Sequence, residues 1–258
     1  MMKNKLSLYF MLSIACLVCQ SCLFKENDIF DDSSANRATS DVQKCEELLT
    51  SYVNGWLMAY YYGIDYRYGG INLLCKFDGK EVTMASQGYD GDETITSLYQ
   101  VKSEESTMIT FDSYNLYIHR FCEPLGGTTN PNANNEGDYE FIVSEYSAER
   151  IVLRGKKYGN IIVMTPMSTE VSWKGFMNSV NKIDQAAKNG RYQICIDGAV
   201  IGTVSRNDNT FAITYTQNEE IIMLSNESFI FNATGFSTTF TREPSSSLAS
   251  AIGDDSLT

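Results

Sequence analysis

The side chains with the greatest capacity for chemistry in this 258-residue chain include seven cysteines. Five of them remain once the N-terminal signal segment of residues 1–21 is set aside, and none of these is spaced as Cys-x-x-Cys: Cys22, Cys45, Cys75, Cys122 and Cys195. If Cys22 is modified, the other four allow three disulfide pairings. Cys45 and Cys75 fall on predicted apolar faces, where a free cysteine behaves as a small hydrophobic residue. We therefore expect buried thiols in preference to disulfides.

The single histidine, His119, and one acidic run are the other candidates for catalysis or metal binding. A catalytic triad needs a nucleophile and an acid beside the histidine, and the sequence contains no nucleophile elbow. One histidine also excludes a multi-histidine metal site within the chain. The run Asp90-Gly91-Asp92-Glu93 offers carboxylates to calcium but lacks the twelve-residue loop pattern. We predict no catalytic residues, no metal site and no cofactor.

The remaining chemical signal is a cluster of aromatic rings, which comprises Trp56, Tyr60, Tyr61, Tyr62, Tyr66 and Tyr68. Trp and Tyr faces stack on sugars, and a tyrosine hydroxyl adds a hydrogen bond at a wet rim. Packing in the core is the favoured interpretation for Trp56 and Tyr60. For Tyr66 and Tyr68, which lie in a glycine-flanked turn, packing and ligand binding both stay open. The candidate ligand contacts are Tyr66, Tyr68, Tyr62 and Trp56.

The N-terminus is typical of an exported protein. Lys3 and Lys5 precede a short apolar run over residues 6–18, which reads as a signal peptide and is too short for a spanning helix. Ser21 directly precedes Cys22, in a loose form of the bacterial lipobox with Cys19 where leucine is usual. We predict a lipoprotein signal peptide over residues 1–21 and lipid attachment at Cys22. Cys19 and an ordinary secreted protein with a leftover cysteine are the alternatives.

Residues 22–40 are predicted to be a flexible acidic tether between the anchor and the folded part. Acyl chains on Cys22 would hold the protein stably, because each buried CH₂ contributes about 0.8 kcal/mol. The run Lys25-Glu26-Asn27-Asp28 resembles the acidic export signals of Bacteroidetes surface lipoproteins, and a solvated tether explains it equally well.

Composition excludes two classes of partner. The net charge of −12 argues against nucleic acid, whose phosphates need clustered Lys and Arg, and against holding an anionic membrane by surface charge alone. The aromatic content of 12% and only four prolines favour an ordered, strand-rich fold.

Alternating apolar residues over 70–86 predict the central hairpin of that fold. Asp78-Gly79 is read as its two-residue turn, which would place Phe77 opposite Lys80 and gather the apolar residues of both strands on one face. Asp197-Gly198 predicts a second two-residue hairpin turn.

Taken in order, these signals predict a mainly β fold of the β-rich α+β type. A helix from about residue 41 opens a first β domain over residues 41–166, an antiparallel meander that could close as a small lipocalin-like barrel. A connecting helix over residues 167–190, with an apolar stripe that includes Met177 and Val180 at helical spacing, leads to a second, smaller antiparallel region over residues 191–243. Residues 244–258 are predicted to form a loose tail.

The sequence resembles an uncharacterised Bacteroidetes lipoprotein family, domain of unknown function 4302. The resemblance is collinear from about residue 22 to about residue 240 and is carried by Asn54-Gly55-Trp56 and by the segments at 70–78, 138–143, 155–160 and 164–166. It implies an outer-membrane lipoprotein, often encoded near starch-utilisation-type nutrient transporters. It implies no known activity and no catalytic residues.

These observations predict a lipid-anchored, surface-exposed binding or accessory protein of nutrient uptake. Its partners would be the outer membrane, a glycan or peptide ligand and a starch-utilisation-type transporter complex, with no nucleic acid. The alternatives are a carboxylate-dependent hydrolase, with two acids converging in a cleft, and an adhesin or assembly subunit.

Overall fold

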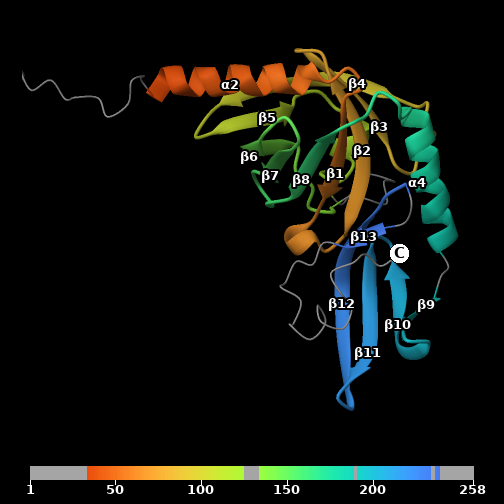
Figure 1. Cartoon of the computed structure of the whole chain (residues 1–258). Coiled ribbons are helices and arrows are strands. Elements are labelled where there is room, and N and C mark those ends of the chain that lie inside the picture. The colour runs from red at the N-terminus through yellow and green to blue at the C-terminus, as the bar shows by residue number, and fades with distance from the viewer. Residues whose placement is uncertain (1–33, 125–133, 189–190, 234–235, 239–258) are drawn as a thin grey trace, which may run out of the picture. The chain divides into compact units, whose positions relative to one another are not determined.

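The computed structural model of the protein describes residues 34–124, 134–188, 191–233 and 236–238 (Figure 1). The predicted signal peptide, Cys22 and the predicted tail lie outside these ranges. The contacts group both β regions in one compact unit that begins at Ala38.

The first β region is a closed antiparallel barrel in which each strand pairs with the next and β8 pairs back to β1. Closure sets Trp56 opposite Pro166 and Tyr61 opposite Ile161. Its strands are β1 (Trp56–Tyr61), β2 (Gly70–Phe77), β3 (Glu81–Ser86), β4 (Ile95–Ser103), β5 (Thr107–Phe111), β6 (Glu140–Tyr146), β7 (Ile151–Gly155) and β8 (Ile161–Pro166).

Large side chains fill the barrel interior. Trp56, Met58 and Tyr60 alternate along β1 and are fully buried, as period-two patterning requires. Helix α2 (Ser34–Ser51) adds Cys45 and Leu49 to the same core. The helix begins at Ser34, so residues 34–40, which were assigned to the tether, are helical.

The first hairpin has the predicted faces but a different register. Phe77 lies opposite Val82, and the predicted pairing with Lys80 is wrong. Because the side-chain period of a strand is two, this shift of two residues leaves every apolar residue on its predicted face. Cys75, opposite Met84, is accordingly buried.

The side chain of Asp78 explains the shifted register. Its carboxylate accepts hydrogen bonds from the backbone N–H groups of Lys80 and Glu81, at 2.9 and 2.6 Å. The backbone N–H of Asp78 also donates to the carbonyl of Glu81 at 3.1 Å. Asp78 is therefore held as the residue before the turn, and Gly79 and Lys80 are the two turn residues.

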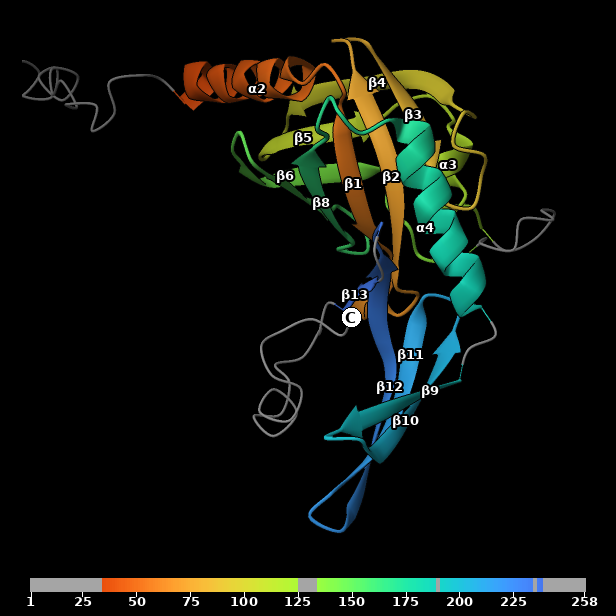
Figure 2. The same ribbon diagram turned by 45° about the vertical axis from the view of Figure 1, so that its right-hand side comes forward.

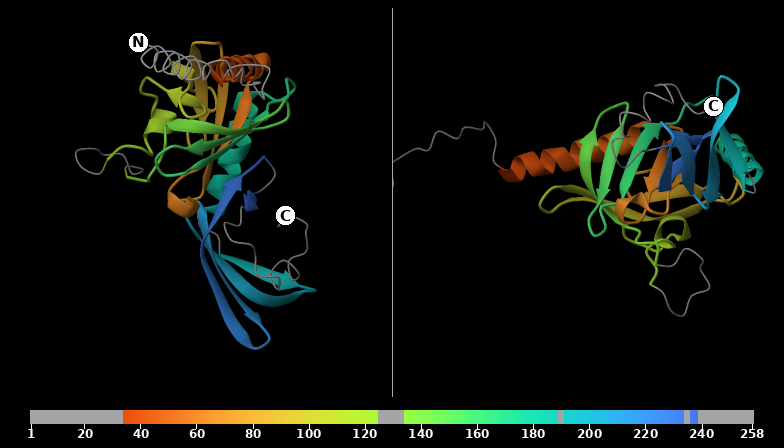
Figure 3. Two further views of the ribbon diagram at one scale, coloured as in Figure 1. Left: turned by 90° about the vertical axis from the view of Figure 1, so that its left-hand side faces the viewer. Right: turned by 90° about the horizontal axis from the view of Figure 1, so that it is seen from below.

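The second β region is a five-stranded sheet in the order β13-β12-β11-β10-β9 (Figure 3). The predicted turn at Asp197-Gly198 is confirmed: Ile196 pairs with Ala199, and both turn residues have positive φ, 51° and 81°. The strands are β9 (Arg191–Ile196), β10 (Ala199–Asn207), β11 (Thr210–Gln217), β12 (Glu220–Phe231) and β13 (Phe236–Thr238).

Helix α4 (Trp173–Ala187) lies along β2 and β3 (Figure 2). Its side chains contribute to two hydrophobic cores. Ser172 caps its N-terminus by accepting a hydrogen bond from the N–H of Gly175 at 3.0 Å. Met177 packs against the outer face of the barrel, whereas Val180 belongs to the core of the second sheet. The predicted apolar stripe of this helix is therefore split between the two β regions.

The predicted fold class is confirmed as mainly β, with a closed antiparallel barrel followed by a helix and a second antiparallel sheet. Two short helical segments were not predicted, η2 (Ile64–Tyr66) and α3 (Leu116–His119). No helix within the described ranges has the length and apolar character needed to cross a membrane.

The four cysteines in the described residues are free thiols. Cys45 and Cys75 are buried as expected, and Cys195 is exposed. Burial raises the pKa of Cys45 to about 12 and raises that of Cys75 further. These two thiols therefore act as core side chains and stay protonated at neutral pH.

Candidate functional site

A cleft of about 600 Å³ lies where five segments distant in sequence meet. These are the β1–β2 turn, the loop after β3, residues 120–121 and 135 between α3 and β6, the end of α4 and the turn between β10 and β11. The lining residues are Tyr62, Arg67, Tyr68, Ile71, Gln87, Gly88, Tyr89, Arg120, Phe121, Asn135, Asp184, Lys188, Arg206, Asn207, Asp208, Asn209 and Thr210.

Two predicted aromatic residues form one wall of the cleft. The rings of Tyr62 and Tyr68 are stacked, with centroids 5.9 Å apart and planes at 14°. Phe121 supports Tyr62 from the barrel, at 4.2 Å between centroids. Burial raises the pKa of Tyr62 to about 12, although the charge of Arg120 and a hydrogen bond with Asn209 act against this. Tyr62 is therefore a neutral phenol that can donate a hydrogen bond.

The other two predicted ligand contacts have structural positions. Trp56 is fully buried in the barrel, where its indole N–H donates to the carbonyl of Leu49 at 2.9 Å. Tyr66 does not line the cleft; its carbonyl accepts a hydrogen bond from the hydroxyl of Ser228 on β12 at 2.5 Å. We therefore leave Trp56 and Tyr66 out of the candidate site.

Arg120 places a positive charge in the wall of the cleft. Arg120 directly follows α3 in the sequence. The carbon of its guanidinium group lies 5.1 Å from the ring centroid of Tyr89 and 4.7 Å from that of Phe121. One terminal nitrogen, Nη2, donates to the hydroxyl of Ser86 at 2.9 Å. The residue is only 4% exposed, so its packing fixes the direction of the guanidinium group.

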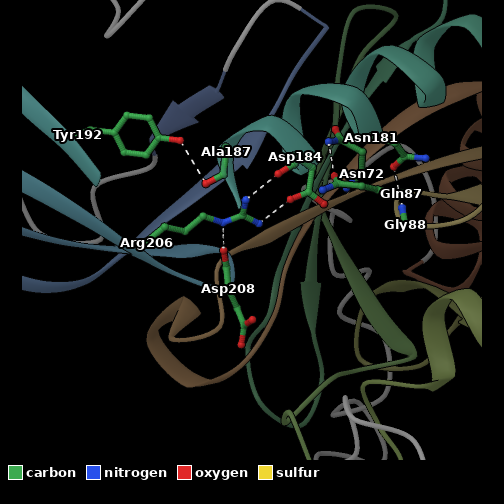
Figure 4. Close-up of polar contacts among 9 residues, drawn as sticks. All are labelled: Asn72, Gln87, Gly88, Asn181, Asp184, Ala187, Tyr192, Arg206 and Asp208. Atoms are coloured by element: carbon green, nitrogen blue, oxygen red, sulfur yellow. Dashed lines mark hydrogen bonds and ion pairs between the residues drawn. The ribbon is translucent and has the colours of Figure 1, made fainter. Parts of the chain in front are cut away.

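On the opposite side, Arg206 joins the second sheet to α4. Its guanidinium group pairs with the carboxylate of Asp184 at 2.5 Å and donates to the carbonyl of that residue at 3.0 Å (Figure 4). It also donates to the carbonyl of Asp208 and lies 4.8 Å from the ring centroid of Phe231. This largely buried ion pair positions the Asp208–Asn209 turn at the cleft.

Amide side chains complete the frame around the cleft. Asn181 on α4 accepts a hydrogen bond from the N–H of Gly88 at 2.8 Å (Figure 4). It also donates to the carbonyl of Tyr89 at 2.8 Å. Asn72 on β2 donates to the side-chain oxygen of Gln87 at 2.9 Å and to the carbonyl of Phe231 at 2.7 Å. The hydrogen bonds of Asn181 thus tie α4 to the loop after β3, and the buried ones of Asn72 tie the barrel to β12.

The remaining chemical candidates lie outside the cleft. His119 is half-buried, stacks on Tyr139 at 5.2 Å, and has its pKa lowered mainly by burial. Asp90 accepts a hydrogen bond from the N–H of Asp92, and Asp92 pairs with Lys174. Within the described ranges, no three His, Cys, Asp or Glu side chains are grouped as metal ligands.

A second polar cluster holds the barrel together around Asp138. Its carboxylate accepts hydrogen bonds from the backbone N–H groups of Lys157 at 2.9 Å, Tyr158 at 3.1 Å and Asn160 at 3.3 Å. The hydroxyl of Tyr60 donates to the carbonyl of Asp138 at 3.0 Å. Burial raises the pKa of Asp138, and the three N–H donors oppose the shift. Two of the segments that carried the family resemblance, 138–143 and 155–160, therefore meet here.

The chain matches the model of one protein family over most of its length. A family model described as "Domain of unknown function (DUF4302)" matches residues 26–242. The chain belongs to this family. No curated protein and no solved structure matches it. The matched segment includes the barrel, α4, the second sheet and every residue of the cleft.

Sequence reasoning missed most of the cleft of this DUF4302 protein. Within the stretch 117–121 the sequence pointed to His119, whereas the residues that line the cleft are the neighbouring Arg120 and Phe121. An arginine inside an otherwise aromatic and apolar stretch is a signal that could have been followed, because such a charge is rarely buried without a role. Asp184, Lys188 and Arg206 carry no such signal, because the sequence alone does not distinguish a charge that lines a cleft from one on the exposed face of a helix or strand.

Proposed function

We propose that this DUF4302 protein is a binding protein that holds a nutrient, a glycan or a peptide, in the cleft. The observation that carries the proposal is the stacked pair of Tyr62 and Tyr68 in a lined cleft of about 600 Å³. That volume suits a small ligand or one end of a chain. Rigid tyrosine rings lose little side-chain entropy on binding and present an apolar face with a hydroxyl.

We further propose that the protein is anchored in the outer membrane by lipid on Cys22 and faces the cell exterior. The basic start, the short apolar run and Ser21-Cys22 support export and lipidation. A transporter complex of the starch-utilisation type is the proposed recipient of the ligand. Anchoring would raise the apparent affinity for polymeric ligands by clustering many clefts on one surface.

Substituting Cys22 by alanine is expected to abolish incorporation of labelled palmitate, because the acceptor thiol is lost. Metabolic labelling followed by immunoprecipitation measures this, with Cys45→Ala as the matched control that keeps its label. On intact cells, external protease should digest the wild type. Palmitate labelling that persists in Cys22→Ala would move the site to Cys19, and full protection from protease until lysis would reject the outward-facing protein.

Substituting Tyr68 by alanine is expected to weaken ligand binding about tenfold, because a single stacked ring contributes about 1 kcal/mol or somewhat more. A glycan and peptide array with the soluble form lacking residues 1–22 would find the ligand, and calorimetry would give the affinity. Tyr66→Ala is the matched control, because Tyr66 lies in the same turn outside the cleft.

Equal affinities of the wild type and Tyr68→Ala would remove the aromatic wall from the binding site. Equal losses in Tyr68→Ala and Tyr66→Ala would point to the fold of the turn instead of to a contact. Release of a new product during incubation would replace the binding proposal with the hydrolase alternative.

A further inference from the structure

We infer that the ligand of this cleft is an acidic oligosaccharide, in which a uronic acid carboxylate lies against Arg120 while its sugar ring stacks on Tyr68. This inference rests on the proposed binding function and names the class of ligand. It comes from the charge of the cleft, the fixed position of Arg120 and the amide side chains beside the rings.

The charge of the cleft is opposite to that of the protein. Four cationic and two acidic side chains line it, a net charge of +2, although the chain carries −12. The cations are Arg67, Arg120, Lys188 and Arg206, and the acids are Asp184 and Asp208. Glu136, which pairs with Arg67 at 3.5 Å, lies beside this lining. A cationic site on a strongly acidic protein favours an anion over a neutral molecule of the same shape.

Arg120 is built as a positioned cation. Its guanidinium group lies between Tyr89 and Phe121 and is oriented by Ser86, so little side-chain entropy remains to be lost when an anion binds. At 4% exposure its charge is poorly screened by water, which strengthens a charge-assisted hydrogen bond to a carboxylate. Such a bond also gives the ligand a defined direction in the cleft.

Two further cations lie nearer the rim. Lys188 follows the end of α4 and is exposed, and Arg67 lies in the turn that carries Tyr68. Both can attract an anion without being part of the folded core. Their substitution therefore tests the charge of the cleft separately from its packing.

The polar groups beside the rings match sugar hydroxyls. Four amide side chains line the cleft, from Gln87, Asn135, Asn207 and Asn209. Amides donate and accept hydrogen bonds at once, which suits hydroxyl groups that do the same. Together with the flat pair of Tyr62 and Tyr68, they favour a saccharide over a peptide, which would pair its backbone with a free strand edge.

The test compares uronic acid trisaccharides of several linkages, each beside its methyl ester, which removes the charge and keeps the shape. By calorimetry, the wild type is expected to bind one acid about tenfold more tightly than its ester, with a preference that falls as ionic strength rises. Lys188→Gln should reduce the preference about threefold, and Arg67→Gln should act in the same direction. Lys182→Gln, on the exposed side of the same helix, is the matched control and should leave the preference unchanged.

Equal affinity of acid and ester in every pair would overturn the inference, and so would a loss on Lys188→Gln that is the same for both. If neutral glycans bind and their binding depends on Tyr68, the ligand is not acidic, and the inference is overturned while the proposed binding function stands. Binding of a peptide with a free carboxylate in place of any saccharide would overturn the class of ligand. If no member of the glycan and peptide arrays binds, the binding function itself fails and the inference with it.

Discussion

Substituting Gly69 by alanine is expected to lower the free energy of unfolding by about 3 kcal/mol or more and to abolish ligand binding. A Cβ at this position would lie 1.8 Å from the carbonyl oxygen of Asn209 and 2.5 Å from its carbon. Gly69 also has a φ of 78°, which costs an alanine about 1 kcal/mol. Because the obstructing atoms are backbone, the β10–β11 turn has to move away from the barrel.

This movement would open the cleft from one side. Asn209 lines the cleft, and its carbonyl accepts a hydrogen bond from the N–H of Phe229 at 3.2 Å. Displacing it would separate the amide and basic groups of the second sheet from Tyr62 and Tyr68. Urea denaturation measures the loss of stability, and calorimetry with the ligand found on the array measures the loss of binding.

Gly79→Ala is the matched control for Gly69→Ala. Gly79 also has a positive φ, 98°, but a Cβ there would meet nothing within 4 Å. Its substitution should cost only the backbone term of about 1 kcal/mol and leave binding unchanged. Losses of equal size in the two variants would show that strain in the turn, and not the approach of Asn209, makes glycine necessary at position 69.

Substituting Asp138 by alanine is expected to destabilise the barrel by about 3 kcal/mol, which corresponds to a fall in Tm of roughly 10 °C. The carboxylate is the acceptor for the backbone N–H groups of Lys157, Tyr158 and Asn160, and alanine offers none in its place. Buried donors without an acceptor cost about 1 to 3 kcal/mol each before relaxation. Thermal unfolding followed by circular dichroism measures the change.

Asp138→Asn separates hydrogen bonding from packing at the same position. The single carbonyl oxygen of asparagine can still accept some of the three hydrogen bonds. The Asp138→Asn variant should therefore lose about half as much stability as Asp138→Ala. Gly155→Ala should also be destabilising, because its Cβ would lie 1.9 Å from a carboxylate oxygen of Asp138. A fall in Tm as large for Asp138→Asn as for Asp138→Ala would mean that both oxygens are required and that no partial network forms.

Patterns within the sequence predicted the elements of this protein well. The alternation in residues 70–86 placed Leu73 and Cys75 on a buried face, and the helical spacing of Met177 and Val180 predicted the stripe of α4. The turn at Asp197-Gly198 was predicted in its correct register. These features depend on neighbours a few residues apart, and the sequence displays those neighbours directly.

Side-chain hydrogen bonding within a turn was harder to predict. Asp78 and Asp197 both precede a glycine, yet only Asp197 is itself a turn residue. Asp78 uses its carboxylate to accept from the two N–H groups that follow Gly79, and this moves the turn by one position. The dipeptide alone does not distinguish the two outcomes, because both are compatible with the same alternating pattern.

The sequence by itself determined most of the strands, the two long helices, their buried faces and the general mainly β fold, because periodicity and turn chemistry are local. Only the tertiary structure decided that Tyr62 and Tyr68 share a cleft with Arg120 and Asn209, and that Tyr66, which the sequence left open, lies outside it. Local patterns do not contain this information, since the cleft depends on how β12 and the β10–β11 turn pack on the barrel. That packing rests on contacts between residues more than a hundred positions apart, such as Asn72 with Phe231, and periodicity gives no sign of such contacts.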